Sequence, residues 1–145
     1  GKTIMSGYIG DEALTSTILK DGTIYTSDNG YLDADGRLHL TGRNDDVINV
    51  GGYKVAPSEI ENHVMAINGI TTCICIPTKH PILGYSIKLL YTCDDDCLVT
   101  SKEIATYLSK RVERYKIPQS YAQVDSIQRT YNGKLNRKYY IAEDK

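Results

Sequence analysis

The sequence lacks the features that would place it in a membrane or on a nucleic acid. No apolar run approaches the ~18 residues of a membrane-spanning helix. Lys plus Arg number 17 and Asp plus Glu number 18, so no basic excess is available to attract a phosphate backbone. Phe and Trp are absent, although there are 12 Tyr. With 24% charged and 41% apolar residues, we expect a globular chain without a membrane span and without a nucleic-acid partner.

Cysteine is also scarce, and its spacing is not that of a zinc ribbon. Cys73 and Cys75 form C-x-C, and Cys93 and Cys97 form C-x-x-x-C, whereas zinc ribbons use C-x-x-C pairs. The first pair lies in an apolar run typical of a buried strand. We interpret these residues as core thiols in a reducing compartment, which predicts a cytoplasmic protein with no bound metal. A disulfide, or a metal site with His80, is the alternative.

Glycine divides the chain, because nine of its 12 glycines fall within residues 1–52. Asp-Gly at 21–22 and 35–36 and Asn-Gly at 29–30 are strong hairpin signals. We therefore predict that residues 1–43 form β-hairpins. This segment holds few large apolar residues and could not build a core alone, so it resembles the end of something larger.

Residues 44–145 are predicted to form an α+β fold. Strands are expected at 70–76, 86–92 and 121–127. Capping boxes, apolar spacing and stop signals predict about three helices: one from the box at 58–61 to Asn68-Gly69, one from the box at 100–103 to Pro118, and a short one near Lys134. The fold class that follows is a small sandwich of short sheets and helices, preceded by β-hairpins.

The first segment that could carry chemistry is the polar turn around Asp28. A carboxylate on a tight turn can accept two hydrogen bonds from the vicinal hydroxyls of a ribose. The alternative is an ordinary Asx-turn.

The second segment stands where the composition changes. Arg43 is followed by two Asp, the first of which is Asp45. Gly51 and Gly52 then join two apolar, β-type runs, which predicts a hairpin tip with close backbone approach. The alternative is a linker and a hairpin whose charges are merely solvated.

The third segment is the basic stretch 129–138. Asn132-Gly133 allows a tight turn and is expected to place Lys134 at a helix start. A cation there is unfavourable by ~0.3–1 kcal/mol against the helix dipole, and a residue in a locally poor position invites a functional interpretation. The alternative is a solvated basic turn.

Taken together and in order, these segments resemble the C-terminal end of the ANL superfamily, which comprises acyl-CoA synthetases, adenylation domains of peptide synthetases and luciferases. Residues 26–28 resemble its T-G-D motif, and residues 33–36 resemble its D-x-D-G hairpin. Residues 42–61 resemble the hinge motif G-R-x-D-D-x-I-x-x-x-G-x-[RK]-[IV]-x-P-x-E-[IV]-E, and residues 129–137 resemble R-T-x-x-G-K-x-x-R. The resemblance covers essentially the whole chain.

Two positions depart from the family pattern. Ser27 replaces the middle glycine of T-G-D, which is expected to tighten or shift the ribose turn. Gln128 stands where a proline usually precedes R-T, so the approach to Lys134 is expected to be less rigid.

The resemblance implies a two-step reaction. A carboxylic acid and ATP, with Mg, give an acyl-adenylate, and a thiol then takes the acyl group. It implies that residues 1–43 are the tail of a large N-terminal adenylation domain and residues 44–145 a mobile C-terminal domain. The expected function is that of the C-terminal part of an acid–CoA ligase, as in fatty acid metabolism, which is inactive without its N-terminal domain. The partners expected are that domain, the acid, ATP and coenzyme A.

Two other hypotheses stay open. One is a peptide-synthetase-type adenylation enzyme that loads a carrier protein. The other is a non-catalytic module that keeps the fold. The residues downstream of Lys145 would separate the first of these from the ligase, because a carrier domain there would favour it.

Residue roles are implied by the same motif match. Asp28 would hold the ribose hydroxyls, Arg43 would contact the ribose or phosphates, and Lys54 would approach phosphate. Lys134 aligns with the catalytic adenylation lysine, whose ammonium bridges the acid oxygen and the α-phosphate.

The remaining implied roles concern the change between the two steps. Asp45 aligns with the hinge residue about which the C-terminal domain rotates. Gly51 and Gly52 would line the tunnel for the pantetheine of coenzyme A, where a side chain would block the thioester step.

Overall fold

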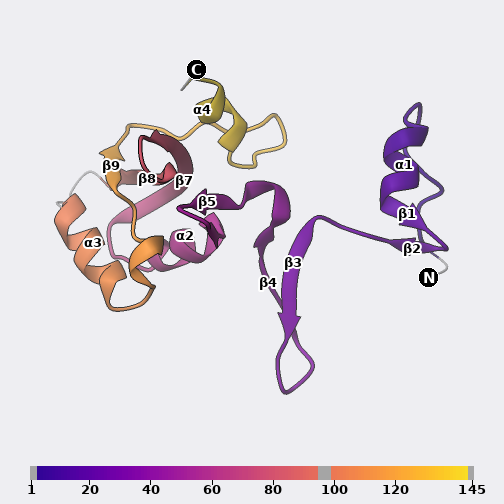
Figure 1. Ribbon diagram of the computed structural model, residues 1–145, viewed down its shortest axis with the longest axis horizontal. Helices are drawn as coiled ribbons and strands as arrows, with labels where there is room; N and C mark the ends of the chain where they lie inside the picture. Colours follow the sequence, from indigo (N-terminus) through magenta and orange to yellow (C-terminus); the bar gives the residue numbers. More distant parts are fainter. Residues whose placement is uncertain (1–2, 95–98, 144–145) are drawn as a thin grey trace.

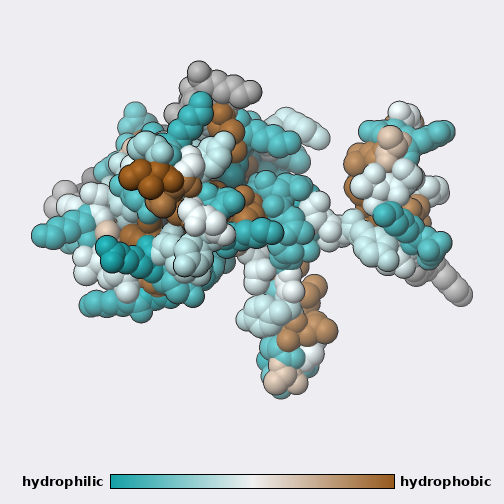
Figure 2. Space-filling view, in the orientation of Figure 1, coloured by the Kyte–Doolittle hydropathy of each residue, from teal (hydrophilic) through white to brown (hydrophobic). Residues whose placement is uncertain are grey.

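The structure, a computed structural model, describes residues 3–94 and 99–143 and divides into a loosely packed N-terminal part and a compact C-terminal body (Figure 1). The N-terminal part has one helix and two antiparallel hairpins; its elements are α1 (Glu12–Ile18), β1 (Leu19–Lys20), β2 (Thr23–Ile24), β3 (Asp28–Leu32) and β4 (Leu38–Arg43). No residue from 3 to 47 is buried. Apolar side chains are visible on the β3–β4 hairpin and around α1 (Figure 2).

Helix α1 corrects the prediction that residues 1–43 form only β-hairpins. Asp11 caps this helix, because its Oδ1 accepts a hydrogen bond of 2.8 Å from the Leu14 amide. Asp is among the preferred N-cap residues, so the local signal was present in the sequence. The prediction of hairpins instead followed the high glycine content of residues 1–43.

Two of the three predicted hairpin turns are confirmed. Asp21-Gly22 joins β1 to β2 with positive φ at both residues, and Gly36 lies in the turn between β3 and β4. Asn29-Gly30 is not a turn, because it lies inside β3 at an irregularity in the pairing with β4. A Cβ at Gly30 would lie 2.7 Å from the carbonyl oxygen of His39, so this glycine permits a close strand approach.

The C-terminal body is built on a mixed sheet in the order β6-β5-β8-β7, with β9 parallel to β8. The remaining neighbours in this order are antiparallel. The elements are the 3-10 turn η1 (Asn44–Asp46), β5 (Ile48–Val50), β6 (Tyr53–Val55), α2 (Pro57–Met65), β7 (Ile70–His80), β8 (Gly84–Cys93), α3 (Ser101–Ser109), η2 (Arg114–Lys116), β9 (Ser120–Gln123) and α4 (Arg137–Glu143).

Strands β7 and β8 are covered on both faces, which explains their nearly continuous apolar sequence. Their odd-numbered core residues pack with residues of α2 and α3 in one cluster that includes Cys73, Cys75, Leu89, Ile60 and Leu108. Three of their even-numbered residues pack against the C-terminal segment in a second cluster that includes Ile74, Ile76, Leu90, Ile127 and Leu135. The result is an α+β sandwich, as predicted.

The interpretation of Cys73 and Cys75 as core thiols is confirmed, since both are buried and unbonded to another sulfur. Burial raises the pKa of the Cys73 thiol to about 12. Cys93 is half-buried, and Cys97 lies outside the described residues.

Several predicted boundaries were wrong. The capping box predicted at 58–61 is not formed, since α2 has no side-chain cap and ends at Met65, and the strand predicted at 70–76 extends to His80. Helix α3 ends at Ser109, and Val112 and Tyr115 reach the core from the following turn and η2. Strand β9 ends at Gln123, although Ile127 is buried. The last helix begins at Arg137, three residues after Lys134. For α3 and β9, the apolar spacing identified the core residues but not the backbone conformation that brings them into the core.

Candidate functional site

Asp28 and Arg43 lie opposite each other on β3 and β4. Their side chains form an ion pair, with 3.3 Å between Arg43 Nε and Asp28 Oδ1, and both are about half exposed. The residues that follow Asp28 and Arg43 are also linked through their side chains, because Asn29 Nδ2 donates a hydrogen bond of 2.7 Å to Asn44 Oδ1. The structure therefore brings two of the predicted nucleotide-binding residues together on an open surface, where polar ligand groups can reach both.

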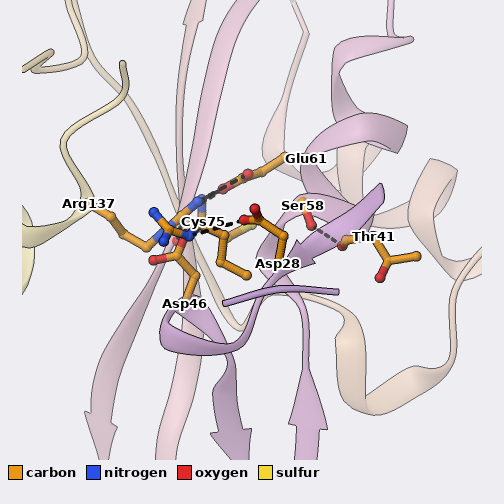
Figure 3. Close-up of polar contacts among 8 residues, drawn as sticks. Asp28, Thr41, Asp46, Ser58, Glu61, Cys75 and Arg137 are labelled. Atoms are coloured by element: carbon orange, nitrogen blue, oxygen red, sulfur yellow. Dashed lines mark hydrogen bonds and ion pairs between the residues drawn. The ribbon is translucent and has the colours of Figure 1, made fainter. Parts of the chain in front are cut away.

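Asp45 is the middle residue of η1, which connects β4 to the C-terminal body. Within residues 3–94 and 99–143, its side chain has no hydrogen bond or ion pair. A hydrogen bond joins the two segments on either side of η1: Ser58 Oγ, at the start of α2, donates to the carbonyl oxygen of Thr41 on β4 at 2.5 Å (Figure 3). A Cβ at Gly42 would collide with the same hydroxyl at 2.5 Å, so the close contact requires glycine.

Gly51 and Gly52 form the tip between β5 and β6, as predicted, and both have positive φ. The Gly51 amide donates to the Leu83 carbonyl at 3.2 Å, and a Cβ at Gly51 would lie 2.9 Å from Leu83 Cδ2. Gly52, in contrast, faces open space, with no atom within 4 Å of an added Cβ. The backbone conformation favours glycine at both positions. A Cβ at Gly51 would displace only the end of the Leu83 side chain, whereas Gly52 faces space that a ligand can occupy.

Shallow grooves flank this glycine tip. One, of about 630 Å³, is lined by both glycines together with Asn49 and residues 82–85. The other, of about 360 Å³, is lined by Gly51 and by the rings of Tyr53 and Tyr115, which stack with their centroids 4.3 Å apart. The tip therefore borders concave surface on which a narrow chain could lie.

Lys54 and Lys134 are both exposed and belong to different parts of the body. Lys54 lies on β6 opposite Asn49, and Lys134 lies on the turn that follows Arg129. Neither ammonium has an ion pair or hydrogen bond among the described residues. Each is available to an anion, but this structure does not join them to the Asp28–Arg43 pair.

The turn that carries Lys134 is held by backbone contacts. The Gly133 amide donates to the Thr130 carbonyl at 2.9 Å, and the Thr130 amide donates to the Lys134 carbonyl at 2.7 Å. Arg129 Nη1 donates to the Gly133 carbonyl at 2.9 Å. The prediction of a tight turn is confirmed, whereas the placement of Lys134 at a helix start is wrong. The argument from the helix dipole therefore does not apply to Lys134.

The cation that does begin a helix is Arg137. Its guanidinium forms a two-pronged ion pair with Glu61, with N–O distances of 2.7 and 3.3 Å (Figure 3). It also donates to the Cys75 carbonyl and lies 3.6 Å from Asp46 Oδ2. Burial opposes its charge, but Glu61 and Asp46 outweigh this effect, so the pKa of Arg137 is raised above its ordinary value.

Sequence reasoning included Arg137 and Glu61 in its motifs but assigned them no role. The two residues are 76 positions apart, and no local pattern links them. The available signal was only that both lie beside apolar core positions. This cluster of Asp46, Glu61, Cys75 and Arg137, here called the Arg137 cluster, is a finding of the structure.

The structure shows neither a metal centre nor a membrane helix in the part it describes. No group of three or more His, Cys, Asp or Glu side chains within that part could hold a metal ion. Of the described helices, none is long and apolar enough to cross a bilayer.

Comparison with known proteins gives CoA ligases as relatives. The chain is 31% identical over 99% of its length to 2-succinylbenzoate–CoA ligase of Staphylococcus epidermidis, and 33% identical over 95% to 4-coumarate–CoA ligase 5 of Oryza sativa. It is 26% identical over 99% to a long-chain-fatty-acid–CoA ligase of Bacillus subtilis. The chain spans only 26–30% of the length of these relatives.

Solved structures agree in fold. The chain matches o-succinylbenzoate CoA synthetase of Bacillus subtilis, in complex with its acyl-adenylate, with a TM-score of 0.89 at 25% identity, covering 97% of this chain and 28% of that one. It matches ATP-bound MatB of Rhodopseudomonas palustris at 0.86 and apo MatB at 0.72, both at 25% identity, covering all of this chain and 30% of each. The same relative therefore fits better in its ATP-bound form.

A family model decides the relationship. The AMP-binding enzyme C-terminal domain matches residues 59–134, just over half of the chain. This range includes most of α2, the central β7–β8 hairpin, α3 and the turn up to Lys134. The chain therefore belongs to the family of AMP-binding enzyme C-terminal domains, in the C-terminal part of the ANL superfamily of adenylate-forming enzymes.

Proposed function

We propose that this chain is the C-terminal part of an AMP-forming acid–CoA ligase, which converts an acid and MgATP to an acyl-adenylate and then to a thioester of coenzyme A. The observation that carries the proposal is the contrast between two cations three residues apart. The Arg137 side chain is only 14% exposed and is paired, whereas Lys134 is exposed, without a partner among the described residues, and held on a tight turn. A charge displayed in this way suits an external anion.

Lys134 would act by electrostatic stabilisation. Its ammonium would lie between the acid oxygen and the α-phosphate as negative charge develops there. Loss of one such preorganised donor typically costs about 3–4 kcal/mol of transition-state stabilisation. Asp28 would accept hydrogen bonds from the ribose hydroxyls, while Arg43 and Lys54 would contact the ribose or phosphates.

The second step would use the glycine tip. The exposed position of Gly52 and the grooves beside it fit a thin pantetheine chain lying against the backbone. Gly51 would support this tunnel from behind through its contact with Leu83. The names of the relatives favour coenzyme A over a carrier protein as the acceptor.

The division into two domains belongs to the same proposal. Residues 1–43 would be the tail of the large N-terminal domain, and residues 44–145 would rotate about Asp45. Two observations support it: no residue from 3 to 47 is buried, and the two forms of MatB match this chain with different scores at equal coverage. The second observation indicates that the corresponding region of MatB changes shape between its forms.

Several classes of acid fit the proposal, and fatty acids are one of them. The relatives are named for succinylbenzoate, coumarate and long-chain fatty acids. A cytoplasmic location also stays a prediction, supported by the reduced thiols of Cys73 and Cys75.

The test separates the two half-reactions in the full-length enzyme. Lys134→Ala is expected to cut adenylation, measured as pyrophosphate exchange, by ~10²–10³-fold while the KM for ATP stays nearly unchanged. Conversion of a supplied acyl-adenylate to the thioester should persist. Gly52→Trp should show the opposite pattern, with thioester formation lost and adenylation retained. Lys134→Arg should not rescue adenylation, because a planar fork cannot replace a compact ammonium.

Near-normal adenylation by Lys134→Ala would refute the proposed mechanism. An equal loss of both half-reactions in that variant would instead assign Lys134 to the fold. The 145-residue chain alone should show no exchange with any acid tested, and clear turnover would contradict the need for an N-terminal domain.

A further inference from the structure

The Arg137 cluster joins three distant stretches of the chain. Arg137 begins α4, Glu61 lies on α2, and Asp46 ends η1 (Figure 3). The side chains of Arg137 and Glu61 are only 14% and 13% exposed. A guanidinium and a carboxylate removed from water to this extent are held in place by each other, since either alone would be strongly unfavourable there.

The cluster also covers the free edge of the central sheet at Cys75. Strand β7 is at the end of the order β6-β5-β8-β7. At Cys75 the outward backbone groups are both occupied, because the amide donates to Glu61 Oε1 at 2.6 Å and the carbonyl accepts from Arg137. Arg137 is thereby fixed to the backbone of the sheet as well as to a side chain, which leaves little freedom for its own position.

Arg137 is three residues from Lys134, and short contacts make the connection stiff. Arg129 and Leu135 form a β-bridge across the turn. The Asn136 amide donates to the Gln128 carbonyl at 2.9 Å, and the Gln128 amide donates to the Tyr140 hydroxyl at 2.9 Å. The missing proline at position 128 is compensated by these bonds. A displacement of Arg137 would therefore move the whole turn that carries Lys134.

The other end of the cluster lies next to the hinge candidate. Asp46 follows Asp45 directly, and its carboxylate faces Arg137 Nε at 3.6 Å. Arg137 Nε is buried and has no hydrogen bond, so this contact is an ion pair only. The same guanidinium thus links the first residue after Asp45 to the turn with Lys134.

We propose that Arg137 is a positioning residue for adenylation, which fixes Lys134 relative to the hinge through Glu61, Cys75 and Asp46. This inference rests on the proposed function and adds a residue that makes no contact with substrate. When the domain rotates about Asp45, the cluster carries Lys134 with Asp46 as one rigid body. Misplacement of a catalytic group by about 1 Å can cost ~10²-fold in rate, so loss of the cluster impairs the step that needs Lys134.

The experiment uses Arg137→Met in the full-length enzyme and measures each half-reaction with its KM and the thermal midpoint. Adenylation kcat is expected to fall ~10–100-fold. The KM for ATP and thioester formation from supplied acyl-adenylate should stay within about threefold of wild type. Arg137→Lys should recover only part of the adenylation rate, because it cannot make the two-pronged contact with Glu61.

Lys116→Met is the matched control. The Lys116 side chain is 13% exposed and is paired with Glu59 of α2 at 2.7 Å, so it resembles Arg137 in burial and pairing but has no link to the turn of Lys134. It should lower the thermal midpoint without changing the ratio of the two half-reactions. The double variant Glu61→Met/Arg137→Met removes both charges, so it should recover stability relative to the single variant but not adenylation.

A final variant tests whether Arg137 acts through Lys134. On the Lys134→Ala background, Arg137→Met should reduce adenylation by no more than about threefold further, because residues that act as a unit are not additive. A full additional loss would overturn the inference, as would a parallel fall of both half-reactions in Arg137→Met. If Lys134→Ala cuts adenylation and Arg137→Met does not, only this inference fails. If Lys134→Ala itself adenylates normally, the proposed function fails.

Discussion

Two antiparallel hairpins of this chain obey the same local rules but differ in how they are packed. The β3–β4 hairpin leaves Leu32, Leu38 and Leu40 66–68% exposed. The β7–β8 hairpin buries Ile74, Leu89 and other residues almost completely, because helices cover one face and the C-terminal segment covers the other. Strand pairing alone therefore does not produce a core, and the apolar residues of β3–β4 stay exposed in the part of the chain that the structure describes.

The largest expected difference between the two regions is in amide hydrogen exchange of the 145-residue chain. Amides of β7 and β8 should exchange only by global unfolding, whereas those of β1–β4 should exchange by local opening. With a global stability of ~5 kcal/mol, the slowest core amides should exchange at least ~1,000-fold more slowly. Comparable protection in both regions of a monomer, followed by NMR, would contradict the contrast.

Truncation of matched leucines should sharpen the comparison. Leu89 is fully buried and Leu38 is 66% exposed. Leu89→Ala is expected to lower the free energy of unfolding by about 2–5 kcal/mol, because it leaves a cavity, and Leu38→Ala should change it by less than ~0.5 kcal/mol. Urea unfolding monitored by circular dichroism measures both. A similar cost for both variants would mean that β3–β4 is packed within this chain.

Alkaline pH should weaken the C-terminal body. Burial disfavours the charge of Lys116, but Glu113 and Glu59 outweigh this and raise its pKa to about 12 from an ordinary 10.5. Its contribution is fully present below pH 10.5 and is lost as pH rises through 12. Burial also raises the pKa of Tyr121 to about 12, which acts in the same direction.

Lys116→Met should therefore reduce, but not abolish, the fall in unfolding free energy between pH 10 and 12. Urea titrations at a series of pH values, on wild type and variant, measure this difference. The same slope in both proteins would show that the Lys116 ion pairs do not stabilise the native state.

Local sequence predicted the parts of the fold that local contacts determine. The capping box at the start of α3 is present as expected, with Glu103 accepting from the Thr100 amide at 2.8 Å and donating its own amide to Thr100 Oγ1 at 3.3 Å. The glycine tip at Gly51-Gly52 and the tight turn before Lys134 were also predictable. Each depends on residues within four positions of one another.

Predictions failed where one local signal fits two structures. Asn-Gly at 29–30 is compatible with a turn, but in the structure it lies inside β3. Its glycine there allows the backbone to approach the carbonyl group of His39. The apolar spacing from Ile104 to Tyr115 satisfies one long helix, but the chain leaves the helix at Ser109 and still delivers Val112 and Tyr115 to the core. The apolar spacing predicts which residues are buried, but more than one backbone conformation can bury the same residues.

By itself, the sequence determined the fold class, the order of most elements and the motifs that suggested adenylate-forming enzymes, because these depend on short-range spacing and residue type. Only the tertiary structure decided which charged residues face a ligand and which hold the fold. Lys134 and Arg137 are equivalent by local pattern, and they differ because Glu61, 76 positions away from Arg137, meets that residue in a site shielded from water. Burial of a charge requires a partner, and folding brings that partner from a distant part of the chain.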